Sequence, residues 1–526
     1  MSNIVMQPCD EGVVRSEAPA SPCAKSSRPY VLAVTILGSS MVFIDGTVVN
    51  VALPALQADM NASVLDVQWV VESYALLLAA LLLPGGALGD RYGRKRVFIA
   101  GATLFALASV WCGLAPSIEQ LIAARAVQGI GGALLVPGSL AIIGASFRTE
   151  ERGAAIGTWS GFTAITTALG PVLGGWLIEH VSWRAVFLLN APLAVLVILL
   201  AWRHVPESRD DDREGELDWR GALLATVALG TIVYALIEAP RLGFGDARVL
   251  GALASGVLAS IAFIRLEARI RSPMVPLALF RSRDFSGANL LTLFLYTALG
   301  GALFFLPLNL IQVQGYGATA AGAALLPFIL IMFFLSRWSG GLVARFGARP
   351  PLMIGPAVAA VGFLLFVRPS VGGSYWTTFF PAIVVLGLGM AVSVAPLTTA
   401  VLNAAGERRA GIASGINNAV ARTAALLAIA ALGLVLQYVF NVVLDRHLTA
   451  LDLAPETRRI VDAQRDKLAG ADYGDRVTVE TQVTLRDATN DAFVAGFRRV
   501  MTIAALLALA SALSGAVLIR SAKQGP

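Results

Sequence analysis

The sequence predicts an all-α membrane protein in which two six-helix bundles and two inserted helices give fourteen transmembrane helices. Of the 526 residues, 56% are hydrophobic and 14% are charged, whereas soluble globular domains are roughly 25% charged. The apolar runs are continuous over about 20 residues, as in membrane-spanning helices, whereas barrel strands alternate over about 10 residues. A motif that ends the second apolar run also recurs in the second half of the chain.

Fourteen apolar runs are long enough to span a bilayer. They cover 30–54, 68–89, 97–115, 119–146, 153–178, 184–204, 219–238, 248–267, 285–311, 318–344, 350–368, 375–400, 411–440 and 498–520. The expected parts are a disordered tail (1–28), a first six-helix bundle (29–204), a linker with two inserted helices (205–284), a second six-helix bundle (285–520) and a short tail (521–526).

The distribution of cations predicts which loops face the cytoplasm, because cytoplasmic loops carry an excess of lysine and arginine. The loops after even-numbered runs carry Arg91, Arg94, Lys95, Arg96, Arg148, Arg152, Arg203, Arg209, Arg213, Arg265, Arg269, Arg271, Arg281, Arg283, Arg345, Arg349, Arg408 and Arg409. We therefore expect both termini to be cytoplasmic. The polar stretch 441–491 is expected to be an extracytoplasmic loop, since long loops cross a membrane regardless of charge.

The composition argues against several other classes of protein. The net charge of +6 lies in short loops and forms no basic stripe, so no nucleic-acid partner is expected. Three cysteines give no disulfide framework, and three histidines, which lie far apart, give no metal site. No nucleotide-binding loop of the form Gly-x-x-x-x-Gly-Lys-Ser/Thr occurs. We expect no cofactor, no metal and no enzyme activity.

The motif GALGDRYGRK at 86–95 returns as GGLVARFGAR at 340–349. Its glycines permit close packing and a tight turn, and an acid among cations needs an arginine or the positive end of a helix as its partner. A generic membrane turn is the alternative. We interpret the first copy as a gating element formed by Gly86, Asp90, Arg91, Gly93 and Arg94.

Intramembrane charges occur in the first and fourth runs. Asp45, in FIDGTVVNVALPAL, would cost about 2.5–3.5 kcal/mol if it were charged and faced lipid. It is therefore expected to face the bundle, either as a proton-exchanging acid or as a structural hydrogen-bonding group. Arg125 lies one helical turn from Gln128, and a cation there would tune the proton affinity of a nearby acid. A purely structural ion pair is the alternative.

In the fifth run, GTWSGFTAITTALGPVLGGWL contains Gly170, Pro171 and Gly174. Proline bends a helix and glycines let neighbouring helices approach. We include these three residues among the gating residues.

Together these motifs resemble the major facilitator superfamily, in its fourteen-helix drug–proton antiporter branch. The resemblance covers about residues 30–520. It implies a major facilitator fold, export in exchange for protons, Asp45 as the leading proton carrier and Arg125 as its modulator. It also implies that the loop at 86–95 fastens the two halves on the cytoplasmic side, with Asp90 facing the helix that begins near Gly411.

Further polar and aromatic residues complete the expected site. Glu72 is a second candidate for proton coupling, and Glu238 is a weaker one because it lies close to the surface. A substrate cavity is expected at Asn50, Gln128, Trp159, Phe162, Tyr296 and Asn417. For the aromatic residues, core packing or lipid contact is the alternative, and for Asn417 a hydrogen bond between helices.

The sequence thus predicts a proton-coupled exporter of amphipathic or apolar compounds, such as drugs or antibiotics, in the cytoplasmic (inner) membrane. A metabolite or siderophore exporter and a lipid translocase of the same fold are alternatives. A non-transporting sensor or scaffold is a third, disfavoured by the intramembrane Asp45 and Arg125. The expected partners are a small amphipathic substrate, protons and the bilayer. A periplasmic adaptor and an outer-membrane channel would join them if the source is a bacterium with two membranes.

Overall fold

The computed structural model describes residues 27–209, 218–270, 273–405, 410–451, 453–474 and 477–520. Within these ranges every regular element is a helix. Thirteen helices in them are long and apolar enough to cross a membrane, and a fourteenth apolar helix, α15 (Arg349–Leu365), is shorter. The prediction of an all-α protein with fourteen transmembrane helices is therefore confirmed. Of the expected tails, only residues 27 and 28 lie within the described ranges.

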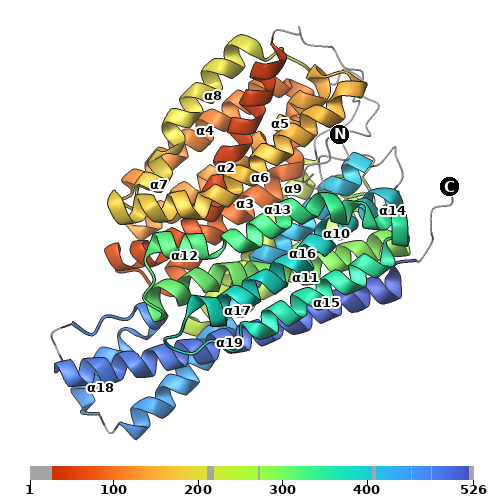
Figure 1. Ribbon diagram of the computed structural model, residues 1–526. Coiled ribbons are helices and arrows are strands. Elements are labelled where there is room, and N and C mark those ends of the chain that lie inside the picture. Colours follow the sequence, from red (N-terminus) through yellow and green to blue (C-terminus); the bar gives the residue numbers. More distant parts are fainter. Residues whose placement is uncertain are drawn as a thin grey trace.

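The first bundle forms the upper part of Figure 1. It consists of α2 (Arg28–Asp59), α3 (Val64–Tyr92), α4 (Arg94–Leu114), α5 (Ile118–Ser146), α6 (Thr149–His180), α7 (Ala185–Leu188) and α8 (Asn190–His204). Side-chain caps set some of the helix starts. The Ser63 hydroxyl accepts from the Asp66 amide and the Asp66 carboxylate accepts from the Ser63 amide, which satisfies two backbone donors at the start of α3.

The second bundle forms the lower part of Figure 1. It consists of α11 (Arg283–Leu308), η2 (Asn309–Val313), α12 (Ala318–Ala324), α13 (Leu326–Gly340), α14 (Leu342–Phe346), α15, α16 (Tyr375–Ala405), α17 (Ala410–Ala450) and α19 (Val479–Leu518). η2 is a π-helical turn that follows Pro307. A proline near the end of a helix removes a backbone donor and loosens the local hydrogen-bond pattern.

The two bundles repeat the same packing. α2 packs on α6 as α11 packs on α17, α4 packs on α5 as α15 packs on α16, and α3 packs on α5 as α13 packs on α16. The similarity first seen in one loop motif therefore extends to whole sets of helices.

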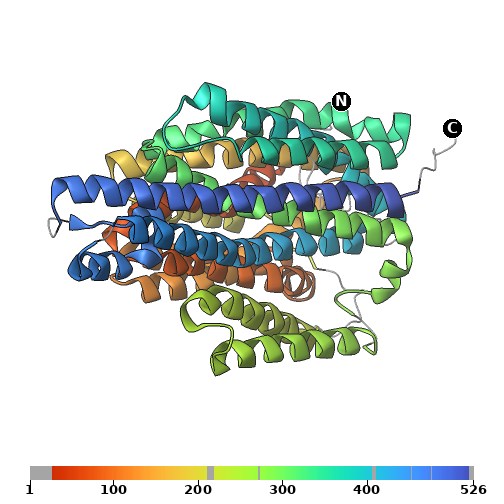
Figure 2. The ribbon, with the colours of Figure 1, turned by 90° about the horizontal axis from the view of Figure 1, so that it is seen from below.

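Two inserted helices, α9 (Trp219–Leu242) and α10 (Ala247–Glu267), pack on each other and precede the short helix η1 (Leu277–Arg281). Figure 2 shows the pair at the lower edge of the molecule. α9 contacts α3 of the first bundle and α17 of the second. Its contact residues form one apolar cluster of Leu65, Val233, Ile237, Leu426 and Ala430. The inserted helices therefore lie across the seam between the bundles.

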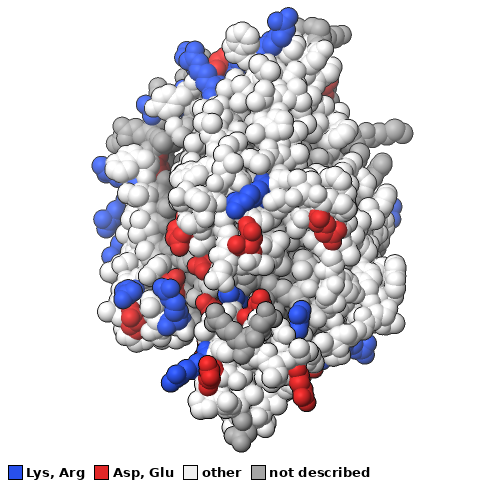
Figure 3. All heavy atoms as spheres, turned by 90° about the vertical axis from the view of Figure 1, so that its left-hand side faces the viewer, with Lys and Arg blue, Asp and Glu red and all other residues white. Residues whose placement is uncertain are grey.

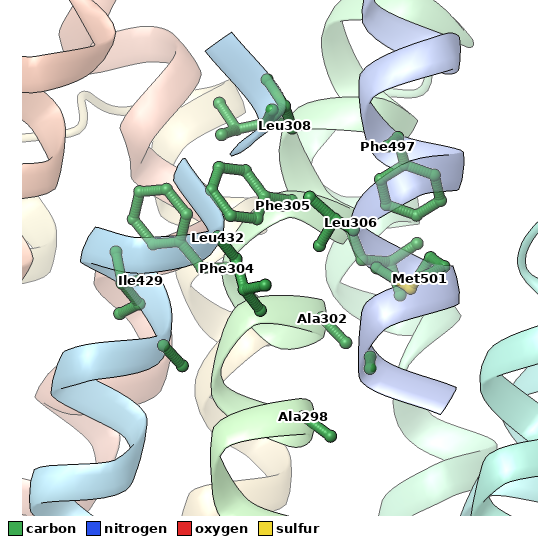
Figure 4. Packing of buried hydrophobic residues seen from close by; sticks show 14 of the residues in the cluster. Ala298, Ala302, Phe304, Phe305, Leu306, Leu308, Ile429, Leu432, Phe497 and Met501 are labelled. Atoms are coloured by element: carbon green, nitrogen blue, oxygen red, sulfur yellow. The ribbon is translucent and has the colours of Figure 1, made fainter. Parts of the chain in front are cut away.

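The core of the second bundle is built from aromatic and branched aliphatic side chains. Figure 4 shows Phe304 and Phe305 of α11 beside Ile429 and Leu432 of α17, with Phe497 of α19 on the opposite side of the view. The rings of Phe304 and Phe305 are 4.9 Å apart and meet edge to face, an arrangement that aromatic pairs prefer. These contacts fix α11 between the two longest helices.

The polar stretch 441–491, which we call the hairpin, is largely helical. α17 continues through it to Ala450, α18 (Pro455–Asp462) and η4 (Arg465–Gly470) follow, and α19 begins at Val479. Figure 1 shows the hairpin projecting beyond the other helices, opposite the C-terminal end of the chain. We call these two ends of the molecule the hairpin side and the termini side. Figure 3, which faces the hairpin side, shows cations and anions interspersed there.

Ion pairs hold the hairpin together. Asp445 of α17 pairs with Arg465 at 2.5 Å and with Arg458 at 3.1 Å. The Tyr473 and Thr489 hydroxyls hydrogen-bond at 2.6 Å. Burial raises the pKa of the neighbouring Asp466 carboxyl above its ordinary value. The hairpin is therefore a packed substructure with its own polar contacts.

We predict that Gly389→Ala destabilises the protein, because α15 and α16 touch there backbone to backbone. A Cβ at Gly389 would lie 2.7 Å from the Ala359 Cα, so the helices would have to separate. We expect a loss of about 1–3 kcal/mol, measured by thermal unfolding in detergent. Gly251→Ala is the matched control, since a Cβ there meets no atom within 4 Å. Equal stability of the two variants would contradict the prediction.

Candidate functional site

Asp45 lies in the middle of α2 and is 1% exposed. Its carboxylate accepts from the Arg125 guanidinium at 2.5 Å, from the Gln128 amide at 2.9 Å and from the Asn190 amide at 3.3 Å. Asn190 and Gln128 also donate to the Ser109 hydroxyl. Side chains from α2, α4, α5 and α8 thus form one buried polar network. The expectation that Asp45 faces the bundle agrees with this geometry.

Arg125 is equally buried and makes further contacts. Its guanidinium donates to the Val70 carbonyl at 3.1 Å and to the Gln128 side-chain oxygen at 2.7 Å. Its central carbon lies 4.1 Å from the centre of the Tyr74 ring, a distance typical of cation–π contacts. A buried cation is tolerated only when such partners replace water. Arg125 therefore joins α5 to α2 and α3.

Glu72 of α3, unlike Asp45 and Arg125, is buried without polar partners among the described residues. It is 0% exposed, and neither carboxyl oxygen has a hydrogen-bond partner among the described residues. One turn before it, Gln68 lies against Gly433 of α17, and Leu65 packs with Leu426 in the cluster at the α9 seam. Residues one or two turns apart share a helix face. Glu72 therefore lies on the face of α3 that meets the second bundle.

The residues expected to line a substrate cavity do not form one set. Trp159 is 0% exposed inside the first bundle, where its indole donates to the Thr35 carbonyl and the Ser39 hydroxyl. Asn417 is buried in the second bundle and donates to Asn289 and Thr292. Gln128 belongs to the Asp45 network. Asn50 and Tyr296 are half-buried, and Phe162 is 52% exposed.

The Gly-Pro motif of α6 contacts helices of both bundles. A Cβ at Gly170 would collide with Thr47, and one at Gly174 would lie 2.7 Å from Val48, so α6 packs tightly on α2. On its other face, the Pro171 carbonyl lies against Gly322 of α12. This motif therefore lies where the first bundle meets the second.

The loop motif at 86–95 ends α3 on the termini side. Asp90 accepts from Arg94 at 3.0 Å, and Arg91 lies over the Tyr92 ring. Gly86 packs on Pro137 of α5, and Gly93 has a φ of 107°, a conformation that favours glycine. Residues 406–409, just before the expected partner helix, lie outside the described ranges.

Glu207 is a residue of this loop region whose role the sequence did not indicate. Its carboxylate accepts from the Lys95 amide at 3.1 Å and lies against Gly93. The Lys95 ammonium donates to the Trp202 carbonyl at 2.7 Å, and the Arg94 amide donates to the Ser208 carbonyl. The end of α8 therefore fixes the start of α4. The sequence signal was an acid close to the loop cations after the sixth run.

Asn190 is the second residue that the sequence analysis did not assign. It is 1% exposed and bridges Asp45 and Ser109 from α8. A lone amide within the apolar run 184–204 was the available signal, because a buried amide needs partners.

We predict that Asp45→Asn lowers the stability of the protein by about 3–5 kcal/mol, because Arg125 would remain buried without its counter-ion. Thermal unfolding in detergent measures the effect. Combining it with Arg125→Met removes both charges and should restore part of the loss. A single variant as stable as the wild type, or a double variant less stable than both single variants, would contradict the prediction.

Comparisons with known proteins show the family to which this chain belongs. Residues 35–430 match the Major Facilitator Superfamily. The chain is 36% identical over 436 residues to the multidrug resistance protein Stp of Mycobacterium tuberculosis, covering 82% of this chain and 80% of that protein. It is 32% identical over 518 residues to the tetracenomycin C resistance and export protein of Streptomyces glaucescens, covering 96% and 94%.

Solved structures agree on the fold. A bacterial homologue of the human lysosomal transporter Spinster, in an inward-facing and unoccupied conformation, superposes with a TM-score of 0.65 at 18% identity and covers 93% of this chain and 98% of that one. The match therefore shows the fold alone. The family match and the two relatives identify the chain as a multi-pass membrane transporter of the Major Facilitator Superfamily, in its fourteen-helix branch of drug resistance and export proteins.

Proposed function

We propose that the protein exports amphipathic drugs or antibiotics from the cytoplasm in exchange for protons. The relatives are named for multidrug resistance and for tetracenomycin C resistance and export, which supports a drug as the substrate. The observation that carries proton exchange is the coexistence of a compensated acid, Asp45, and an uncompensated one, Glu72, both fully buried.

The termini side is the cytoplasmic side in this proposal. Arg91 lies there at the end of α3 and Arg94 and Lys95 at the start of α4, and the loops of this side carry most of the arginines between helices. Positive charge is retained in the cytoplasm during insertion. The hairpin, with both signs of charge interspersed, then lies outside.

Alternating access is the proposed mechanism. Two structurally repeated bundles can rock about a shared seam and expose a central site to each side in turn. On the hairpin side the bundles are in contact here, since Gln312 of η2 donates to Gln57 of α2 at 2.9 Å and Gln57 donates to the Lys467 carbonyl of η4 at 3.0 Å. In the proposed cycle, this state with the hairpin side closed precedes release of the drug to the outside.

The two acids have different electrostatic environments. Three donors stabilise the ionised Asp45, one of them a guanidinium. An ionised Glu72 would lack any such donor, at a cost of several kcal/mol, so we propose that Glu72 carries a proton in this state. Because it lies on the face toward the second bundle, movement of the bundles would expose it and release the proton. Asp45 is the alternative carrier, through opening of its pair with Arg125.

We predict that Glu72→Gln abolishes proton coupling, because glutamine mimics the neutral acid and cannot ionise. In proteoliposomes, drug-stimulated proton movement should fall by at least tenfold, while downhill drug exchange persists. Asp45→Asn tests the alternative carrier in the same assay. Glu238→Gln is the matched control, since that acid pairs with Arg241 at the end of α9.

Undiminished proton movement in Glu72→Gln would remove Glu72 from the mechanism. If Asp45→Asn alone abolished coupling, the proton would be assigned to Asp45. Loss of downhill drug exchange in both variants, with both proteins still folded in the proteoliposomes, would show that the acids act in drug binding instead.

We predict that Asp90→Asn opens the termini side, because it weakens the pair with Arg94 that shapes the loop. A partly exposed pair contributes about 1 kcal/mol, so a several-fold change is expected. A cysteine at Leu83, next to Gly415 of α17, should react several-fold faster with an impermeant maleimide in inside-out vesicles. An unchanged labelling rate would count against a gating role for this loop.

A further inference from the structure

Glu179, at the hairpin-side end of α6, contacts α12 of the second bundle. Its carboxylate accepts from the Thr319 hydroxyl at 2.5 Å and from the Thr319 amide at 3.2 Å. Both of its oxygens are therefore used by one residue of the other bundle. Hydrogen bonds to an ionised acceptor are shorter and stronger than neutral ones, so this contact is a specific link between the bundles.

The backbones beside this contact are in close approach. A Cβ at Gly175 of α6 would lie 2.5 Å from the Ala318 carbonyl oxygen, and one at Gly317 would collide with the Glu179 carboxylate. One turn further along α12, Gly322 meets the Pro171 carbonyl. Small residues on both helices thus bring Glu179 within reach of Thr319. A larger side chain at Gly175 or Gly322 would separate the helices, whereas one at Gly317 would displace the Glu179 carboxylate.

Glu179 lies at the end of α6 that is able to move about Pro171. Pro171 lies inside α6, two turns before Glu179, and a proline within a helix permits bending. The segment from Pro171 to His180 is therefore able to move relative to the rest of α6. Bonds at its far end resist this movement more effectively than bonds near the bend.

We propose that Glu179 and Thr319 form an outer latch that keeps the hairpin side closed until the drug is released. The inference rests on the proposed alternating access and deepens it, because it assigns a specific contact to the outer gate. Breaking the outer latch frees the end of α6 from α12. Glu179 is a positioning residue in this scheme: it controls which side is open and neither binds the drug nor carries the coupling proton.

Spin labels on the hairpin side test the outer latch directly. Val181→Cys and Ala320→Cys place labels at exposed positions on the two sides of the contact, in a chain where Cys9 and Cys23 are replaced and the buried Cys112 is kept. Distance distributions are measured by double electron–electron resonance in lipid nanodiscs. Glu179→Gln and Thr319→Val should each raise the ratio of open to closed distances by about tenfold, since each weakens a charge-assisted hydrogen bond.

The double variant and two controls separate a latch from a general loss of structure. Glu179→Gln with Thr319→Val should open the hairpin side less than the product of the two single effects, because both variants weaken the hydrogen bond between the Thr319 hydroxyl and the Glu179 carboxylate. Thr319→Ser keeps the hydroxyl and His180→Gln changes the adjacent exposed residue, so both should match the wild type. An unchanged distance distribution in Glu179→Gln, or effects that multiply in the double variant, would overturn the outer latch.

A separate measurement distinguishes failure of the proposed function from failure of the outer latch. Drug export by the wild type in proteoliposomes tests the proposed function without reference to the labels. If the wild type exports drug while Glu179→Gln leaves the distances unchanged, the outer latch alone is wrong. If the wild type shows no export, the proposed function is wrong, and the outer latch, which rests on it, fails as the gate of an exporter.

Discussion

Charge inside a membrane protein must be compensated by the protein itself, and the Asp45–Arg125 ion pair is where this constraint acts on the first bundle. Four helices supply side chains to the network around it. Asn190, Gln128 and Ser109 each hydrogen-bond to another member of the network. The Asp45 carboxylate and its partners therefore help to fix the relative positions of four helices, α2, α4, α5 and α8.

The two bundles share their helix packing, but the second does not repeat the Asp45–Arg125 ion pair at its α11–α17 contact. α11 and α17 are joined by neutral groups, with Asn417 donating to Asn289 and Thr292. Their core otherwise consists of apolar packing around Phe304 and Phe305. The first bundle therefore contains a buried ion pair between α2 and α5, whereas α11 and α17 of the second are joined by amides and hydrophobic contacts. Under the proposed function, the first bundle responds to protons and the second supplies the surface against which it moves.

Much of the fold could be predicted because apolar length alone identifies a spanning helix. The proximity of Asp45 and Arg125 could also be inferred, since each needs a partner away from lipid. The hairpin could not be predicted as helical, because residues 441–491 lack the continuous apolar run by which a spanning helix is identified. Nor could the environment of Trp159 be foreseen, because an indole in an apolar run fits a cavity wall or a core equally well.

Contacts between segments that are far apart in the chain also could not be predicted from the sequence. Glu207 lies 112 residues from the Lys95 amide that it accepts from, and Glu179 lies 140 residues from Thr319. Exposed acids near helix ends usually face solvent, so an acid close to cations, as at Glu207, does not by itself reveal which distant segment it contacts. The roles of Glu207 and Glu179 follow from the backbone approach that glycines permit at each contact.

The inserted helices make the two flanks of the molecule unequal. On one flank α9 covers the line where α3 meets α17, and on the other α6 meets α12 and α13 directly. Under the proposed function, a hydrophobic drug that approaches from the bilayer would meet α9 at the α3–α17 seam and, among the described helices, no additional helix at the α6 seam. The insertion therefore makes the lipid-facing approaches to the two seams chemically different.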